Sequence, residues 1–563
     1  MEQIAASGGK KGGHVMNFKY HFVTTSALTK ARLDDNINAF TPQTGATALR
    51  GDKHFFSVLI KGVSIHNGLR LNMEIDSPLK EHITSYVVDQ IPVRQPCYPD
   101  RFDSDYLDTK PGLFPDLLRP ATAVYATSAF LSQLYFEVRV PEDAAPGRYP
   151  VCIRFTQDST GEAVGEVSYE LEVLDAQLPT QQLTVAHWFH YDCLADYYGV
   201  EIFSEAHWTL IENFLAAYVD RGNNSLLTPI FTPPLDTKVG GERPTVQLVD
   251  VTRENGKYTF GFDKLKRFCE MCRRYGIKEL EIAHFFTQWG AEHAPKIMAT
   301  DDGVYRQIFG WETESDSDEY IGFLRALIPA VREQLDALGY KDHYYFHISD
   351  EPREQHLERY SKVKNAILDL IGDRPVRDAL SSFAFYENGV ISNPIPGNNH
   401  LEPFLEARVP DLWTYYCCSQ SKEVSNCHVA MPGYRTRVLG TQLFKFALTG
   451  FLQWGYNFYY NQYSMDEVNP FLNIEGDLFT PAGDNLMVYP GKDGKPLHSL
   501  HELLFEQALL DVRAMEAAAE KVGREAVIAA IDAEGEVNFK QYPRYEDYLL
   551  TLRDAVNRMA AGK

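Results

Sequence analysis

Two neighbouring acids, Asp350 and Glu351, are the residues of this sequence that are best placed to do chemistry. They follow an apolar and aromatic run, HYYFHIS (343–349), and a helical pattern begins directly after Pro352. In chains of alternating strands and helices, barrel enzymes keep their catalytic groups at the carboxyl ends of strands. The simpler interpretation is that Asp350 caps the following helix, with Glu351 and Pro352 in its first turn. The rest of the sequence has to decide between catalysis and capping.

The chemistry open to this acidic pair is limited by its geometry. Adjacent side chains leave a strand end in different directions, so Asp350 and Glu351 cannot readily stand on opposite sides of one glycosidic bond, as the usual two-carboxylate mechanism requires. They do suit substrate-assisted hydrolysis, in which a 2-acetamido group of the sugar is the nucleophile. One carboxylate then orients the acetamido group while the other protonates the leaving oxygen. Close carboxylates in unlike surroundings acquire the different pKa values that these two roles need.

Seven further residues, six of them in or after predicted strands and the seventh, Asp484, flanking the strand predicted at 485–491, offer surfaces that suit a sugar. They are Trp188, His190, Trp413, Tyr415, Trp454, Asn457 and Asp484. Aromatic rings pack against the apolar faces of sugar rings, and polar side chains meet the hydroxyl groups at their edges. We therefore predict that these residues bind the substrate. Core packing is the competing interpretation for about half of the aromatic residues, and a structural, hydrogen-bonded role is the competing one for His190.

From residue 183 onward, strand patterns alternate with helical ones. The eight strands expected are residues 183–190, 225–231, 278–285, 343–349, 377–385, 412–419, 450–460 and 485–491. Eight such units predict a closed (β/α)8 barrel, which we place at residues 179–540 as the catalytic domain. An amphipathic helix within 541–563 is expected to pack on the outside of the barrel.

The first part of the chain is rich in β-strand signals. Residues 17–178 contain short runs of β-branched and aromatic residues separated by turn residues, which predicts a β-sandwich. The fold class is therefore multidomain, α/β plus β, with the sandwich before the barrel. A long loop rich in proline and aspartate, 97–120, is expected to pack the sandwich against its neighbour. Residues 1–16 are expected to be a flexible leader.

Size and charge exclude several classes of protein. At 563 residues the chain is longer than one hydrophobic core usually serves. A net charge of −23 repels phosphate backbones, so no nucleic-acid partner is expected. No apolar run is long enough to span a membrane, and the first residues lack the apolar core of a secretory signal. The cytoplasm is the predicted compartment, and the oligomeric state is left open.

No metal or cofactor is predicted either. Cys269 and Cys272 form a single CxxC in a helical pattern, without the second pair or histidine that a zinc site needs. Phosphate-binding GxxxxGKS and GxGxxG motifs are missing, as is the GxSxG nucleophile motif. These absences disfavour kinases, dehydrogenases and esterases.

Seven segments, taken in order, carry a resemblance to a known family. They are PGLFPD (111–116), FEVRVPEDAAPGRY (136–149), WFHYDCLADYYGV (188–200), SDEP (349–352), DLWTYYC (411–417), GFLQWGYN (450–457) and DNLMVYPG (484–491). The chain resembles glycoside hydrolase family 123, the β-N-acetylgalactosaminidases, and related proteins that share its catalytic domain. The resemblance covers most of the chain and favours catalysis over helix capping.

What the resemblance implies is a retaining exo-hydrolase that works through an oxazolinium intermediate. Glu351 aligns with the general acid/base and Asp350 with the carboxylate that positions the 2-acetamido group. The implied partner is an oligosaccharide or glycoconjugate glycan ending in β-linked N-acetylgalactosamine. Two alternatives stay open, namely a hydrolase of β-N-acetylglucosamine or another modified hexosamine, and a barrel that binds glycans without turnover. The chain departs from the family at His501, within SLHELLFE (499–506), where an arginine is often found.

Overall fold

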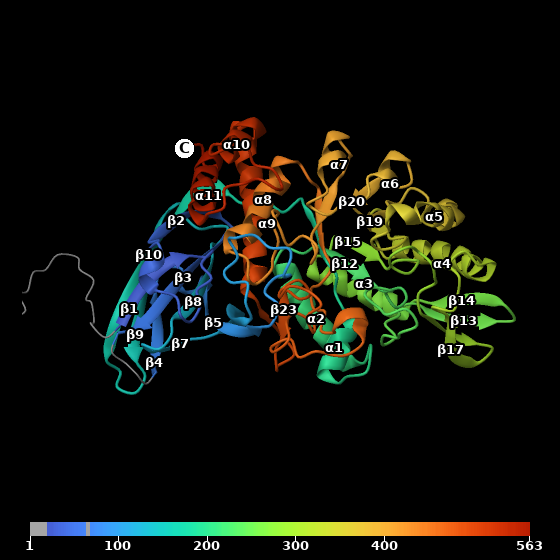
Figure 1. Ribbon diagram of the computed structural model, residues 1–563, viewed down its shortest axis with the longest axis horizontal. Helices are drawn as coiled ribbons and strands as arrows, with labels where there is room; N and C mark the ends of the chain where they lie inside the picture. Colours follow the sequence, from blue (N-terminus) through green and yellow to red (C-terminus); the bar gives the residue numbers. More distant parts are fainter. Residues whose placement is uncertain (1–19, 64–67) are drawn as a thin grey trace, which may run out of the picture.

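The computed structural model describes residues 20–63 and 68–563. The predicted leader, residues 1–16, lies outside the described residues. Figure 1 shows a β-rich region, coloured blue to cyan, at one end of the molecule, and a region of mixed strands and helices, coloured green to orange, at the other.

The β-rich region contains two five-stranded sheets. The first has the order β1-β3-β8-β5-β6 and consists of β1 (Tyr20–Ser26), β3 (Lys53–Gly62), β8 (Ser132–Arg139), β5 (Ile83–Val93) and β6 (Gly112–Pro120). The second has the order β2-β10-β9-β4-β7 and consists of β2 (Gly45–Arg50), β10 (Ala163–Gln177), β9 (Gly147–Gln157), β4 (Leu69–Asp76) and β7 (Ala123–Ala126). Two short 3-10 helices, η1 (Ile37–Ala39) and η2 (Lys80–His82), lie between strands.

One hydrophobic cluster is shared by both of these sheets. Buried and exposed residues alternate along much of β10, so that one face of the strand turns inward. Phe56 on β3 stacks on Tyr169 on β10 with ring centroids 4.3 Å apart, and Phe22 on β1 stacks on Phe155 on β9 at 4.7 Å. The inner faces of the two sheets therefore bury each other's apolar side chains.

The second region is built on parallel strands. A six-stranded sheet of order β18-β15-β12-β11-β22-β21 contains β11 (Thr184–His187), β12 (Ser225–Thr228), β15 (Glu279–Ile282), β18 (Tyr344–Phe346), β21 (Trp413–Tyr415) and β22 (Gly450–Gln453). Its five strand pairs are all parallel. β19 (Arg377–Ala379) and β20 (Asn393–Ile395) form a separate parallel pair. Parallel bridges, Phe346 to Val376 and Gly397 to Tyr415, link this pair to the two outer strands of the six-stranded sheet.

The strand predicted at 485–491 is wrong as a member of the parallel set. Within it, β23 (Val488–Pro490) pairs antiparallel with β24 (Pro496–His498) and with neither β11 nor β22. Its apolar run is indistinguishable by pattern from that of a barrel strand. The additional parallel strand is β20, which the sequence concealed because Pro394 lies inside it, and proline argues against an interior strand.

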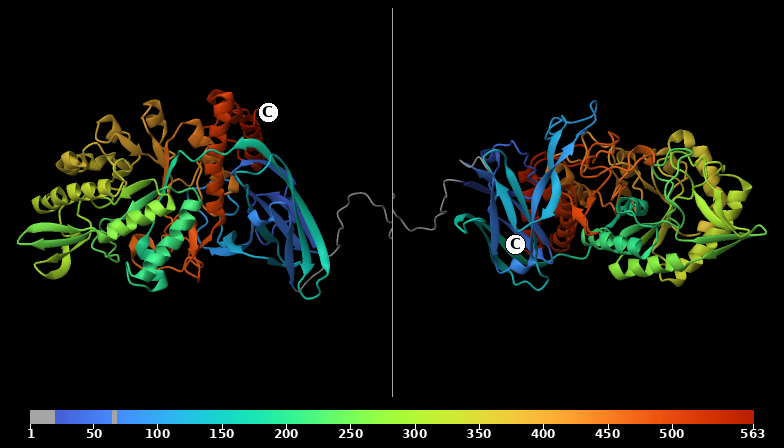
Figure 2. Two further views of the ribbon diagram at one scale, coloured as in Figure 1. Left: turned by 180° about the vertical axis from the view of Figure 1, so that it is seen from behind. Right: turned by 90° about the horizontal axis from the view of Figure 1, so that it is seen from below.

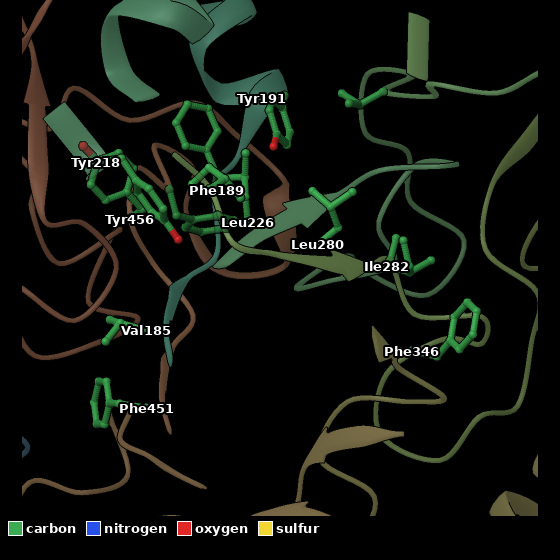
Figure 3. Packing of buried hydrophobic residues seen from close by; sticks show 14 of the residues in the cluster. Val185, Phe189, Tyr191, Tyr218, Leu226, Leu280, Ile282, Phe346, Phe451 and Tyr456 are labelled. Carbon is green, nitrogen blue, oxygen red and sulfur yellow. The ribbon is translucent and has the colours of Figure 1, made fainter. Parts of the chain in front are cut away.

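Side chains alternate between two clusters along the short parallel strands. Leu226, Leu280 and Phe346 belong to the large cluster that also contains residues of the surrounding helices, and Figure 3 shows them among its members. Residues of the opposite parity, such as Leu227 and Tyr345, form a small separate cluster. Its buried members are Ala186, Trp188, Leu227, Leu235, Tyr345, Ala379, Ile395, Trp413, Tyr415 and Leu452. This small cluster lies on the face of the parallel strands opposite to the large cluster.

Helices follow most of these strands. They are α1 (Tyr191–Tyr198), α2 (Glu205–Asp220), α3 (Asp263–Tyr275), α4 (Asp318–Ala337), α5 (Leu357–Ile371), α6 (Ala384–Glu387), α7 (Glu402–Glu406), α8 (Gly433–Lys445), α9 (Leu500–Val522), α10 (Arg524–Ile531) and α11 (Glu546–Ala560), with the 3-10 helices η3 (Glu354–His356) and η4 (Gln462–Ser464). Serine side chains cap the amino ends of α2, α4 and α9. A small sheet of order β14-β13-β16-β17 projects from the region and consists of β13 (Asp250–Glu254), β14 (Lys257–Gly261), β16 (Ile297–Asp301) and β17 (Val304–Phe309). Within residues 20–63 and 68–563, no helix has both the length and the apolar character needed to cross a bilayer.

The two regions are joined by a long loop and by the last helices. Residues 112–120 of the predicted loop 97–120 form strand β6, so that part of the prediction is wrong. In the segment before β6, the Tyr98 hydroxyl donates to the Phe479 carbonyl over 3.1 Å and the Tyr106 hydroxyl to the Ser421 carbonyl over 2.6 Å. The C-terminal helices, red in Figures 1 and 2, lie beside the N-terminal sheets, and α11 packs against both α9 and β2. The loop therefore contacts the second region as expected from the sequence.

Candidate active site

A cleft of about 570 Å³ opens among the loops that follow the parallel strands. Its walls come from the ends of β11, β18, β19, β21 and β22 and from the loops after β12 and β15. The lining residues are Trp188, Leu235, Asp236, Gln288, Trp289, Asp350, Glu351, Arg353, Gln355, His356, Ala379, Tyr415, Cys417, Cys418, Ser419, Leu452, Trp454, Gln462, Tyr463 and Phe479. Five of the nine residues predicted from the sequence are among them, including both acids.

The backbone holds the acidic pair in place and does not use it as a helix cap. The Glu351 amide donates to the Ala379 carbonyl over 3.0 Å, and the Asp350 carbonyl accepts from the Trp289 amide over 2.8 Å. Glu351 has a φ of +44°, a conformation that costs a residue other than glycine about 1–3 kcal/mol and that clusters at functional sites. The helices begin later, η3 at Glu354 and α5 at Leu357. The capping interpretation is therefore wrong.

Glu351 is a half-buried carboxyl with one strong partner. The Tyr415 hydroxyl donates to its Oε1 over 2.7 Å. Burial raises the pKa of Glu351, while the Tyr415 hydrogen bond and the charge of Arg353 act in the opposite direction. Since the net shift is upward, Glu351 keeps its proton to a higher pH than an exposed glutamate does. That is the property required of a general acid.

Asp350, also half-buried, experiences a stronger effect of the same kind. Burial raises its pKa well above the usual value, and the neighbouring charges of Glu351 and Asp378 raise it further. No side chain among residues 20–63 and 68–563 donates a hydrogen bond to its carboxyl group. This carboxyl is therefore available to a donor on a ligand.

A third carboxyl group in the cleft, Asp236, was missed in the sequence. It follows β12 in the loop TPPLD and has a φ of +39°. Its Oδ2 accepts from the Tyr463 amide over 3.0 Å, and its own amide donates to the Gln288 side chain. Burial raises the pKa of Asp236 to about 7. The two prolines before it resemble an ordinary loop, so only its place after a strand could have identified it.

Two of the indole rings that line the cleft, those of Trp188 and Trp454, donate hydrogen bonds to carboxylates outside it. The Trp188 Nε1–H donates to Glu281 Oε1 over 2.8 Å, and the Trp454 Nε1–H donates to Asp484 Oδ2 over 2.8 Å. These bonds fix the orientation of the rings and leave apolar surface toward the cleft. Asp484 thus supports Trp454 from a fully buried position and does not line the cleft itself.

Three other residues predicted to bind the substrate also lie outside the cleft lining. His190 and Asn457 hold two strand ends together, because the His190 amide donates to Asn457 Oδ1 over 2.9 Å and Asn457 Nδ2 donates to the His190 carbonyl over 3.0 Å. Burial lowers the pKa of His190 to about 4, so its imidazole is neutral. Trp413 belongs to the small cluster, and the guanidinium carbon of Arg377 lies 4.3 Å from the centroid of the Trp413 ring.

A buried charged layer, formed by Glu281, His347 and Asp378, lies near the acidic pair. The His347 Nε2 is 2.5 Å from Glu281 Oε1, and its Nδ1 is 3.1 Å from Asp378 Oδ1. Burial opposes the charged imidazolium, but the two carboxylates outweigh it and raise the pKa of His347 to about 9. The layer therefore supplies a fixed charge pattern next to Asp350.

One group in this layer has the composition of a metal site. The ligand atoms of His284, His347 and Asp378 lie within 4.8 Å of one another. The two imidazoles, however, are stacked with centroids 4.2 Å apart and planes 14° apart, so their in-plane lone pairs run side by side and do not converge on one ion. Both nitrogens of His347 already contact carboxylates. We therefore assign His347 and Asp378 to charge pairing. Burial lowers the pKa of His284 well below its usual value, so its imidazole is neutral and takes no part in that pairing.

His501, where the sequence departs from the family, has its two ring nitrogens occupied by buried partners. Its Nδ1 lies 2.7 Å from Asp116 Oδ1 and its Nε2 lies 2.7 Å from the Leu486 carbonyl oxygen. It is fully buried and connects the N-terminal region to the second region. It is not among the residues that line the cleft.

The chain is similar to a known protein family and to solved structures. The family model described as the glycoside hydrolase 123 catalytic domain matches residues 188–518. The structure is similar to that of a family 123 glycoside hydrolase from Clostridium perfringens, at 15% sequence identity and a TM-score of 0.73, with 96% of this chain and 98% of that chain covered. Bacteroides uniformis beta-glucuronidase 2 is similar at 11% identity over 84% of this chain and 48% of its own, but its TM-score is only 0.30. No curated protein matches the sequence.

Proposed function

Because the chain belongs to glycoside hydrolase family 123, we propose that it removes terminal β-linked N-acetylgalactosamine from glycans by substrate-assisted catalysis with retention of configuration. One observation carries the proposal, namely that Asp350 and Glu351 line the same cleft, side by side, with raised pKa values. Adjacent acids suit a sugar that supplies its own nucleophile better than they suit the two-carboxylate mechanism.

In the proposed reaction Glu351 is the general acid. It donates its proton to the leaving oxygen as the 2-acetamido oxygen attacks the anomeric carbon, which gives an oxazolinium ion. Glu351, now ionised and stabilised by the Tyr415 hydroxyl, then accepts a proton from the water that opens this ion. The same residue thus serves as acid in one step and as base in the next.

Asp350 is proposed to accept a hydrogen bond from the N–H of the acetamido group. Its carboxyl group has no donor among the described residues, and burial favours its neutral form. A donated N–H lowers the pKa of a carboxyl group, so a bound acetamido group would convert Asp350 to the ionised form. This negative charge then stabilises the positive charge that develops on the oxazolinium ion.

Four other cleft residues complete the proposed sugar site. Trp188, Tyr415 and Trp454 offer aromatic surface to the ring, and Asp236 offers a carboxyl group to a hydroxyl of the sugar. We withdraw the predicted substrate contact for His190, Trp413, Asn457 and Asp484, which support the site from buried positions.

The proposed architecture follows the same elements. The six-stranded sheet, the β19–β20 pair and the two bridges between them arrange eight parallel strands in a ring, which favours a (β/α)8 barrel. The two N-terminal sheets with their shared cluster favour a β-sandwich. The domain boundaries predicted above remain proposals.

The substrate proposed is a glycolipid or glycoprotein glycan, or a fragment of one. The Clostridium perfringens protein is described by its part in glycolipid glycan hydrolysis, and it shares the fold over nearly its whole length. Terminal β-linked N-acetylglucosamine is the alternative substrate, and a panel of aryl β-glycosides would separate the two sugars.

The experiment that tests the mechanism varies the nucleophile. Aryl β-glycosides with one, two and three fluorine atoms on the acetamido methyl group have progressively weaker carbonyl nucleophiles. We expect kcat to fall steeply along this series, and a thiazoline analogue of the oxazolinium ion to inhibit competitively. A rate that is independent of fluorine content would contradict substrate assistance. For the variant Glu351→Gln, the matched control is Glu354→Gln, which changes an exposed acid three residues away and should retain the wild-type rate.

A further inference from the structure

A second cleft, of about 480 Å³, lies on the N-terminal region, far in sequence from the acidic pair. Its walls are one stretch of β5, residues 87–90, the segment from the end of β6 through β7, residues 119–125, and the start of β8 with the residues before it, 130–133. The strands β5, β7 and β8 are labelled in Figure 1. None of the residues that line the catalytic cleft contributes to it.

The charge of this second cleft is opposite to that of the whole chain. The charged residues that line it are Arg70, Arg119 and Asp89, which is two positive charges against one negative. The chain as a whole carries −23. A locally positive cleft in such a protein selects a ligand with a single compact negative group, because a long polyanion is repelled by the surrounding field.

The two arginines differ in their availability. Arg119 is held by Asp89 through two hydrogen bonds, of 2.8 and 3.1 Å, so its charge is already matched. Arg70 lies 3.9 Å from Asp158, and both side chains are about half exposed. A surface pair of that length contributes little, so Arg70 is free to turn to an anionic ligand.

Two exposed aromatic rings stand beside these charges. Tyr125 on β7 is 58% exposed and Phe130 is 38% exposed, although both line the cleft. The backbone under Tyr125 is fixed, because the Ser132 hydroxyl donates to the Tyr125 carbonyl over 2.7 Å. Aromatic faces next to charged and polar groups are typical of sites that bind sugar rings.

We infer that this cleft is a second glycan site, which binds an acidic sugar bearing a carboxylate or a sulfate group. Arg70 pairs with the anionic group, and Tyr125 and Phe130 pack against the ring. The choice of a glycan as ligand rests on the function proposed above, whereas the positive cleft and its exposed rings are independent of it. The site would hold an acidic branch of a glycan while the catalytic cleft acts on a neutral end.

Binding is tested by calorimetry on the full chain with three matched oligosaccharides that lack a terminal 2-acetamido sugar. One carries a sialic acid carboxylate, one carries a sulfate, and one is neutral. We expect the acidic oligosaccharides to bind at least about 10-fold more tightly than the neutral one, with affinity falling as salt is added. The carboxylate and sulfate arms identify which anion is preferred. Equal affinity for all three would overturn the proposal.

Substitutions locate the site. Arg70→Gln should weaken binding of the acidic sugars about 10-fold while leaving the weak neutral binding unchanged, and Tyr125→Ala should weaken all three. Tyr305→Ala and Arg148→Gln are controls, because these side chains are similarly exposed and line neither cleft. Binding that survives both Arg70→Gln and Tyr125→Ala would overturn the proposal, as would competition by the thiazoline inhibitor of the catalytic cleft.

Hydrolysis of a small aryl β-glycoside separates this proposal from the proposed function. Arg70→Gln and Tyr125→Ala should hydrolyse it at the wild-type rate, because neither residue lines the catalytic cleft. Loss of that activity in either variant would contradict the separation of the two sites. Failure of acidic-sugar binding in a chain that still hydrolyses the aryl glycoside would overturn the second site alone.

Discussion

The two clefts of this protein treat charge in opposite ways. In the proposed catalytic cleft, Asp236, Asp350 and Glu351 are half-buried and form no ion pair with any residue of 20–63 or 68–563, and burial raises the pKa of each of them. In the N-terminal cleft, Asp89 is matched by Arg119 in a partly exposed pair. Burial without a counter-charge raises the pKa of a carboxyl group, so that it holds its proton to higher pH, whereas pairing near solvent keeps both partners charged and suits binding. The two clefts have similar volumes, but their different charge environments indicate different functions.

The largest effect on the proposed catalytic cleft is expected from a substitution of Asp350. Asp350→Asn keeps the size of the side chain but removes the negative charge proposed to stabilise the oxazolinium ion. We expect kcat to fall about 10³-fold on aryl and natural glycosides alike, since the charge acts on the sugar and not on the leaving group. Steady-state kinetics test this, with near-ultraviolet circular dichroism to check folding. A loss of less than tenfold would remove Asp350 from the catalytic machinery.

Stability should separate buried charges from exposed ones. Glu281→Gln leaves the buried His347 imidazolium with one partner fewer, so we expect the free energy of unfolding to fall by about 3 kcal/mol. Asp89→Asn breaks the exposed pair with Arg119 and should cost less than about 1 kcal/mol. Denaturant titration of both variants measures the difference. Equal losses would mean that the layer near the acidic pair is not a charged network.

Tyr415→Phe tests how the pKa of Glu351 controls proton transfer. The Tyr415 hydroxyl stabilises ionised Glu351 and so lowers its pKa, and its removal should raise that pKa further. Because the reaction needs protonated Glu351, the alkaline limb of the pH–rate profile should move to higher pH. We also expect kcat to fall about 10-fold, since the water step needs the ionised form. An unchanged or lowered alkaline pKa would contradict this assignment.

The smallest effect is expected at Asp236. Its carboxyl titrates near pH 7, so substrate contact through it should change between pH 6 and 8, roughly one unit either side of that pKa. In Asp236→Asn this dependence of KM should disappear, while kcat changes less than about threefold, because the residue binds a hydroxyl and exchanges no proton in the reaction. The pH dependence of KM for the wild type and this variant decides the matter. A loss of kcat with unchanged KM would assign Asp236 to the chemistry.

Particular residues show which parts of the site can be predicted from the sequence. Asp350 and Glu351 could be placed because a strand, two acids and a proline follow one another without a gap. Asp236 was missed because the two prolines before it resemble an ordinary loop, and only its place after a strand pointed to the cleft. His190 and Asn457 lie after β11 and β22, and Asp484 lies before β23, yet their side chains point into the protein to hold backbone or indole groups. Position along a strand is local information, whereas side-chain direction depends on partners distant in sequence. β20 was not predicted as a strand because Pro394 contradicts the usual strand pattern.

The most direct test of the account is the dependence of Glu351→Gln on the leaving group. Two substrates with the same β-linked N-acetylgalactosamine are compared, one linked to a sugar hydroxyl and one to dinitrophenol, which leaves without a proton. We predict that kcat/KM of the variant falls about 10³-fold on the sugar-linked substrate and much less on the dinitrophenyl glycoside. Equal losses on both substrates, or full activity on the first, would contradict Glu351 as the proton donor.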